Sequence, residues 1–153
     1  MPENSWARLN RNTFASVHQP AEAIPAVCRN QSGPSMIINA WGGFAYDVNR
    51  GDLITFGGGH ADYCGNDVYR FRLSSLRWER AGLSSRMDLY KEAEGIVTAI
   101  PADGLANAPM TSHMYDQLTF LPRADRMIFF GGRPFWDGTG APTYSGARHP
   151  NTG

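Results

Sequence analysis

The segment ITFGGGHADYCGNDVYRF, residues 54–71, places several chemically versatile side chains between two apolar stretches. His60, Asp62 and Tyr63 supply hydrogen-bond donors, acceptors and an aromatic surface. Asn66 adds a carboxamide, and three glycines precede the histidine. These residue types suit a site that binds a polar ligand. They equally suit a turn between strands, because Gly, Asn and Asp stabilise turns through local hydrogen bonds to the backbone.

The apolar stretches around this segment belong to an internal repeat. Residues 44–58 (FAYDVNRGDLITFGG) align without a gap on residues 118–132 (LTFLPRADRMIFFGG), at an offset of 74 residues. In both copies an apolar stretch, a polar turn and a second apolar stretch end in Phe-Gly-Gly. Each copy is therefore predicted to form a β-hairpin.

Two further strands are predicted after the first hairpin. Residues 67–73 (DVYRFRL) alternate apolar and polar side chains, and residues 76–82 (LRWERAG) follow after a short turn. Four successive antiparallel strands make up one blade of a β-propeller. We expect the inner strands, near 37–47 and 112–120, to run side by side in neighbouring blades.

The glycine pair Gly57-Gly58, followed by Phe71 and, after six intervening residues, Trp78, resembles a kelch repeat. The kelch repeat is the blade unit also seen in the central propeller of galactose-oxidase-like proteins. The resemblance covers about two-thirds of the chain and implies an all-β fold built of kelch-type propeller blades, four-stranded antiparallel meanders. The propeller is expected to be incomplete, because the resemblance accounts for about two blades. Kelch propellers include both binding proteins and enzymes, so the resemblance alone does not choose a function.

Aromatic residues of the pattern are expected to fill the space between blades. Phe71 and Trp78 should be buried there, and Trp78→Ala should lower stability by about 3–5 kcal/mol. Trp6 lies in NSWARLN, which resembles LRWERAG, and is expected to mark a leading outer strand.

We expect the whole chain, 1–153, to be a single partial propeller domain. The remaining blades, or other copies of the chain, would be needed to close the ring. The expected parts are a leading outer strand and loop (1–36), the first blade (37–82), a long inter-blade loop (83–110) and an incomplete second blade (111–153).

Composition narrows the possible partners. Fourteen basic and fourteen acidic residues give a net charge of zero, so neither nucleic acid nor a membrane surface is an expected partner. No signal peptide or membrane span is recognisable in this chain, which is expected to be soluble, and the compartment stays open. Cys28 and Cys64 lack the spacing of a zinc site and are expected to be two free thiols, although a single bridge between them is an alternative.

Blade topology predicts that the long loops share one face of the propeller, where binding sites concentrate. The opposite face would carry only tight turns, near residues 49, 75 and 124. Residues from two blades are therefore expected to form one candidate ligand-binding site. The two histidines of this site should lie within about 15 Å of each other to share a pocket. The site comprises His60, Asp62, Tyr63, Asn66, His113 and Arg133.

Two functions fit this pattern. The first is a binding module that recognises a carbohydrate or a protein surface through the loop-rich face. The alternative is a galactose-oxidase-like or other sugar-active enzyme, an oxidase or an isomerase, whose site needs the missing blades. A copper-radical centre requires a tyrosine cross-linked to a cysteine, and the adjacent Tyr63 and Cys64 do not match that motif. We therefore assign no metal ligand, cofactor or catalytic residue.

Overall fold

The computed structural model describes residues 3–28, 32–39, 42–58, 62–91, 97–130 and 136–137. These residues form an all-β structure, as the sequence predicts, and helical turns occupy only short stretches of them. No helix among them is long and apolar enough to cross a membrane. The helical elements are the 3-10 turns η1 (Phe14–Val17), η2 (Ala21–Ala23) and η3 (Ala26–Cys28), and the helix α1 (Met36–Asn39).

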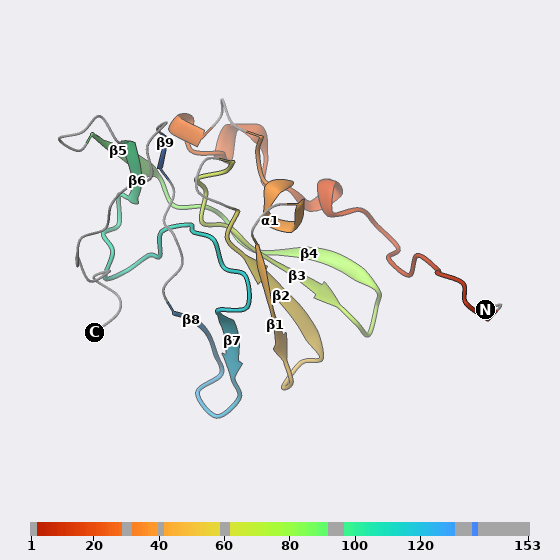
Figure 1. The fold of residues 1–153 in the computed structure, drawn as a ribbon. Helices are drawn as coiled ribbons and strands as arrows, with labels where there is room; N and C mark the ends of the chain where they lie inside the picture. Colours follow the sequence, from red (N-terminus) through yellow and green to blue (C-terminus); the bar gives the residue numbers. More distant parts are fainter. Residues whose placement is uncertain are drawn as a thin grey trace.

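Four consecutive strands form one antiparallel sheet in the order β1-β2-β3-β4 (Figure 1). The predicted four-stranded meander is therefore confirmed. Its first strand is shorter than expected, because α1 occupies the start of the 37–47 stretch. The strands are β1 (Gly43–Asp47), β2 (Asp52–Phe56), β3 (Val68–Arg72) and β4 (Arg77–Gly82).

The second hairpin, β7 (Leu118–Leu121) and β8 (Arg126–Phe129), repeats the geometry of the first. Leu118 pairs with Phe129, and the residues 74 positions earlier, Phe44 and Thr55, pair in the same way. The turns match as well, because the equivalent residues Gly51 and Asp125 both have positive φ angles, 71° and 52°. The repeat in the sequence is thus a repeat in the structure.

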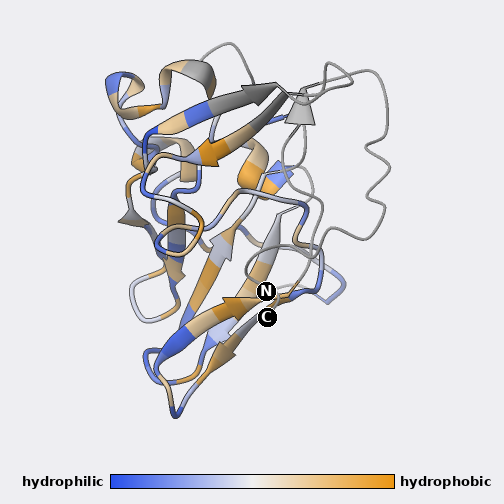
Figure 2. Cartoon of the chain, turned by 90° about the vertical axis from the view of Figure 1, so that its left-hand side faces the viewer, coloured by the Kyte–Doolittle hydropathy of each residue, from blue (hydrophilic) through white to orange (hydrophobic). Residues whose placement is uncertain are grey.

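The second hairpin packs on one face of the first sheet, so β1 and β7 are neighbours as expected. Apolar residues of the two hairpins form a shared core, while the tips of the hairpins are hydrophilic (Figure 2). The aromatic rings of Phe56 and Phe129 lie 5.4 Å apart, centroid to centroid, within it. The core comprises the buried Ala45, Phe56, Met114 and Leu118, with Val68, Phe120, Met127 and Phe129 packed against them.

Glycine permits this close packing at two positions. A Cβ atom on Gly57, whose φ is +100°, would lie 2.6 Å from Cγ of Met114 and 2.8 Å from the carbonyl oxygen of Ser112. A Cβ atom on Gly43 would lie 2.8 Å from Cβ of Met114. The segment leading into β7 therefore approaches the first hairpin more closely than a side chain there would allow.

The turns of the two hairpins are hydrogen-bonded to each other at the end of the sheet that lies away from Gly43 and Gly57. Arg50 donates two hydrogen bonds of 2.6 Å to the carboxylate of Asp125, and Asn49 donates one to the carbonyl oxygen of Pro122. Hydrogen bonds from Arg50 and Asn49 lower the pKa of Asp125 to about 2. The equivalent turns of the repeat are thus held together by charge-assisted hydrogen bonds.

The stretch 83–110, expected to be a long loop, contains a hairpin instead. β5 (Met87–Lys91) and β6 (Val97–Pro101) pair antiparallel, and the short β9 (Trp136–Asp137) pairs with β6. Met87 and Ala99 are buried in a second apolar cluster beside the first sheet. Burial of these side chains is the reason that the stretch forms strands rather than an exposed loop.

The expected outer strand in 1–36 is also absent from the described residues 3–28. Trp6 is fully exposed, with a relative accessibility of 101%. The side chain of Asn12 contacts the edge of β4 instead, donating to the carbonyl oxygen of Trp78 and accepting from its backbone N–H. One carboxamide thus replaces the backbone pairing that a strand would make, and the chain then continues as 3-10 turns.

Phe71 and Trp78 are half-buried, so the prediction that they are buried is wrong. Their rings contact each other at a centroid distance of 5.2 Å, and Trp78 also contacts Phe14 of η1 at 5.0 Å. Part of each ring stays exposed because the N-terminal segment covers the edge of the sheet, not its whole face.

We therefore expect Trp78→Ala to lower the free energy of unfolding by about 2–3 kcal/mol, less than the loss for a fully buried tryptophan. Urea unfolding followed by circular dichroism measures this loss. The fully exposed Trp6 gives a matched control, since W6A should change stability by less than about 0.5 kcal/mol. A loss below about 1 kcal/mol for W78A would show that the contact with Phe14 contributes little.

Candidate functional site

The loop between β2 and β3 lies at the end of the sheet opposite the hairpin turns. The N-terminal 3-10 turns and the β5–β6 hairpin gather at this same end (Figure 1). Tyr115 also belongs to this end, because its carbonyl oxygen lies beside Gly43 at the start of β1. The irregular segments are therefore concentrated at what we call the loop-rich end.

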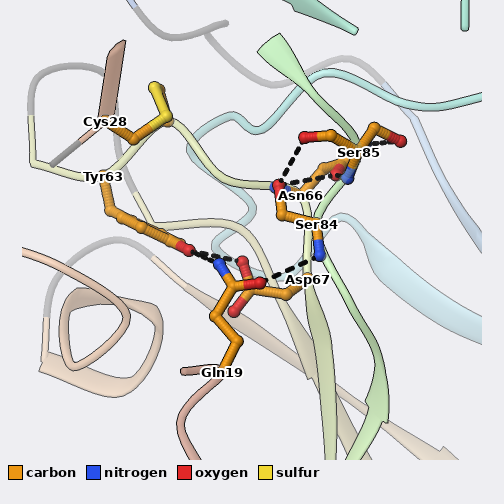
Figure 3. Close-up of a disulfide and its surroundings, with 8 residues drawn as sticks. Gln19, Cys28, Tyr63, Asn66, Asp67, Ser84 and Ser85 are labelled. Atoms are coloured by element: carbon orange, nitrogen blue, oxygen red, sulfur yellow. Dashed lines mark hydrogen bonds between the residues drawn. A yellow bond between two sulfur atoms is a disulfide. The ribbon is translucent and has the colours of Figure 1, made fainter. Parts of the chain in front are cut away.

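Asp67 and the polar side chains around it, which we call the ring, organise this end, and Figure 3 shows the hydrogen bonds among Gln19, Tyr63 and Asp67. The carboxamide of Gln19 donates to the hydroxyl of Tyr63, and that hydroxyl donates to the carboxylate of Asp67 at 2.7 Å. The backbone N–H of Gln19 donates to the hydroxyl of Tyr69, and the interaction of Tyr69 with Asp67 lowers the pKa of that carboxyl group. Gln19 also accepts from the backbone N–H of Ser84. One glutamine thus ties the N-terminal segment to the loop, to β3 and to the segment after β4.

Burial sets the proton affinities within this ring. Asp67 has no exposed surface, and desolvation raises the pKa of its carboxyl group, although the hydroxyls of Tyr69 and Tyr63 act in the opposite direction. Burial, followed by the nearby charge of Asp67, raises the pKa of both tyrosines. Both hydroxyls therefore remain protonated and can donate hydrogen bonds to the carboxylate.

A disulfide joins Cys28 and Cys64 beside this ring, so the expectation of two free thiols is wrong (Figure 3). Their Cα atoms lie 5.4 Å apart, a normal spacing for a disulfide, and both residues are fully buried. The bond links η3 to the β2–β3 loop over a sequence separation of 36 residues. Closing a loop of this length stabilises a fold by about 3–4 kcal/mol in the chain-entropy model.

Asn66 forms a second polar junction. Its side-chain oxygen accepts from the backbone N–H of Ser85 at 2.7 Å and from the hydroxyl of Ser84. Its side-chain nitrogen donates to the carbonyl oxygen of Pro109 at 2.9 Å. Asn66 therefore fastens the segment after β4 and the approach to β7 to the loop.

His113 and Tyr115 form a pair on the segment that leads into β7. His113 is buried, and its Nδ1 atom lies 3.2 Å from the hydroxyl of Tyr115, with the two rings perpendicular. Tyr115 is 53% exposed and has a φ angle of +46°, a conformation uncommon for a residue with a side chain. A surrounding structure that fixes such a conformation is common at binding sites.

The structure gives the predicted site residues different environments. Tyr63 and Asn66 point into the scaffold, where their polar atoms bond protein groups. Asp62 is half-buried, and its carbonyl oxygen accepts from the backbone N–H of Ser32. His60 and Arg133 lie outside the described residues, so the expected distance between His60 and His113 stays a prediction.

Sequence reasoning missed several residues of this end. Gln19 carries no motif, and its role depends on the fold of the N-terminal segment. The sequence pattern places Asp67 at the start of a predicted strand and gives it no role, whereas its buried carboxylate accepts a hydrogen bond from the hydroxyl of Tyr63. Tyr115 could have been found through the repeat, because it occupies the position of another aromatic residue, Trp41.

Metal ligands do not gather in the part of the chain that the structure describes. No group of three or more His, Cys, Asp or Glu side chains in it has a geometry that could hold a metal ion.

Comparison with known proteins found no matching family model, no matching curated protein and no matching solved structure.

Replacing Asp67 with asparagine should change how stability depends on pH. The raised pKa means that the folded state holds this proton to higher pH than the unfolded state, so ionisation costs wild-type stability as pH rises above about 4. The carboxamide introduced by D67N cannot ionise, so this variant should gain stability relative to wild type as pH rises above about 4. Urea unfolding at a series of pH values measures this difference.

Asp88, whose side chain is 46% exposed, provides the matched control. D88N should differ from wild type less than D67N does, because exposed charged groups contribute little to stability. If D67N instead loses stability relative to wild type as pH rises, Asp67 is stabilised as an anion and our account of the ring is wrong.

Proposed function

We propose that this chain is a kelch-like β-propeller segment whose loop-rich end binds an extended polar ligand. A carbohydrate is the ligand class that the exposed side chains favour, and a protein surface is the other ligand that such an end would suit. The remaining blades, or other copies of the chain, complete the walls of the site. In this account the hairpin turns at the opposite end have only a structural role.

The fold supports the proposal in two ways. A four-stranded antiparallel meander is the unit from which propellers are built, and the second hairpin repeats its first half in the same register. The loop-rich end is also held rigid by the disulfide and the ring around Asp67. Long segments fixed on a rigid sheet are the usual location of binding sites.

The position of Tyr115 is the single observation that favours a carbohydrate as the ligand. Its ring is half-exposed at the loop-rich end, while the buried His113 holds its hydroxyl and its backbone is kept at positive φ. A fixed aromatic face with polar groups nearby suits a sugar ring, which presents apolar C–H groups on its faces and hydroxyls at its edge. Fixing the ring in advance lowers the entropy cost of binding.

A catalytic function is less favoured, because the titratable groups that converge do so in the buried interior. Asp67, Tyr63 and Tyr69 meet in one place, but all three are fully buried, and the hydroxyl of Tyr63 donates to Asp67. A general acid or base must reach the substrate directly or through one water molecule. These three side chains therefore serve the scaffold, and a sugar-active oxidase or isomerase would need other groups.

The disulfide between Cys28 and Cys64 indicates the kind of compartment in which the protein works. Buried disulfides form and persist in oxidising compartments, and extracellular polysaccharides are present there. An oxidising environment is therefore part of the proposal.

A glycan array tests the proposal. The biotinylated chain is coupled to streptavidin before use, because multivalent display compensates for weak binding at a single incomplete site. We expect binding to one class of oligosaccharide, and Tyr115→Ala should weaken it about tenfold, which corresponds to about 1.4 kcal/mol. Tyr115→Phe keeps the ring and loses the hydroxyl bonded to His113, so it should weaken binding less than Y115A does.

Two results would contradict the proposal. One is the absence of binding to every glycan class on the array. The other is equal binding by wild type and Y115A, which would remove the role of the aromatic face even if a glycan were bound elsewhere.

A further inference from the structure

Equivalent residues of the two hairpins differ sharply in exposure. Phe56 is fully buried under the second hairpin, whereas its counterpart 74 residues later, Phe130, is 64% exposed. Leu118 is 5% exposed, whereas its counterpart Phe44 is 47% exposed. The contact between the hairpins therefore uses one face of each hairpin, and part of the equivalent face on the other hairpin stays exposed.

The first open surface is the Phe44 face, which comprises Phe44, Tyr46 and Leu53. The strand register places these side chains on the face of β1 and β2 that points away from the second hairpin. Tyr46 is 50% exposed, and Leu53 is half-buried. Their counterparts in the second hairpin, Leu118, Phe120 and Met127, are the side chains that pack on the first sheet.

A groove of about 490 Å³ adjoins this face. It is lined in part by Ile38, Phe71 and Trp78, and Phe71 pairs directly with Leu53 across β2 and β3. The apolar surface therefore continues across the sheet, beyond the first two strands.

The second open surface is the Phe130 face, which comprises Thr119, Leu121, Ile128 and Phe130. These residues lie on the side of β7 and β8 opposite the shared core. Leu121 is 40% exposed, and Thr119 is exposed as well. Two of their counterparts, Ala45 and Phe56, are buried by the second hairpin.

We propose that the Phe44 face of one molecule binds the Phe130 face of a second copy of this chain, in a head-to-tail contact that repeats the packing seen within the molecule. The intramolecular contact joins one face of each kind. Thr55, the counterpart of Phe129, is fully buried, so the second contact would use Phe44, Tyr46 and Leu53. Each molecule carries one open face of each kind, so its own copy is the occupant that matches both. Exposed apolar surfaces of this kind mark interaction sites.

A head-to-tail contact differs from a symmetric dimer, because it uses a different surface on each partner and can continue to further copies. The ion pair between the turns is not repeated, since Arg50 and Asp125 correspond to Ala124 and Gly51. The contact between copies therefore rests on apolar side chains, and salt should affect it little. The inference does not depend on which ligand the loop-rich end binds.

Sedimentation velocity of the purified chain between about 1 and 200 µM tests this contact. Wild type should form dimers and larger species as concentration rises, at both low and high salt. Phe44→Glu and Phe130→Glu should each be monomeric over the same range. Leu83, which is 59% exposed and lies on neither face, gives the control L83E, which should assemble like wild type.

Mixing the two variants gives the decisive result. F44E keeps an intact Phe130 face and F130E keeps an intact Phe44 face, so an equimolar mixture should form a dimer and nothing larger. Because both phenylalanines are exposed, each variant should keep the wild-type circular dichroism spectrum. A wild-type monomer at every concentration, or a mixture that stays monomeric, would overturn the proposal. Assembly that survives in either variant alone would overturn it as well.

Discussion

The close approach of the segment before β7 to the first hairpin is the constraint on which the rest of the structure depends. Gly43 and Gly57 have no side chain where Met114 and Ser112 pass, so the segment before the second hairpin can approach the first sheet closely. This contact buries Phe56 and Leu118 together and aligns the two hairpins in equivalent registers. Because the approach ends at the loop-rich end, it also brings Tyr115 there.

The two ends of the sheet are stabilised by different interactions. At the turn end, exposed hydrogen bonds between Arg50 and Asp125 hold the hairpin tips together. At the loop-rich end, Asp67, Tyr63, Tyr69 and Gln19 are buried, and Gln19, Tyr63 and Asp67 are hydrogen-bonded in sequence beside a disulfide. Buried polar groups must be bonded to be tolerated, so this network specifies one arrangement of the irregular segments. A rigid end of this kind is suited to present Tyr115 to a ligand.

Local pattern made much of this fold predictable from the sequence. Period-two alternation and the 74-residue offset predicted both hairpins, the meander and the neighbouring positions of β1 and β7, because strand register depends on nearby residues. The pairing of Cys28 with Cys64 was not predictable, since it depends on how the N-terminal segment folds back. The same dependence hid Gln19, and it explains why Phe71 and Trp78 are only half-buried. Tyr115 was visible in the repeat, but its positive φ and its contact with His113 were not.

Nuclear Overhauser effects between the hairpins test the packing of the repeat most directly. The measurement uses the chain with its Ala, Leu and Met methyl groups labelled, at a concentration where it is monomeric, or in the F130E variant. The account predicts that the methyl groups of Leu118 and Met114 give cross-peaks to Ala45 and to the ring of Phe56. Cross-peaks from Leu118 to the ring of Tyr46 instead, or none to the first hairpin, would contradict it, because the second hairpin would then cover the other face or neither.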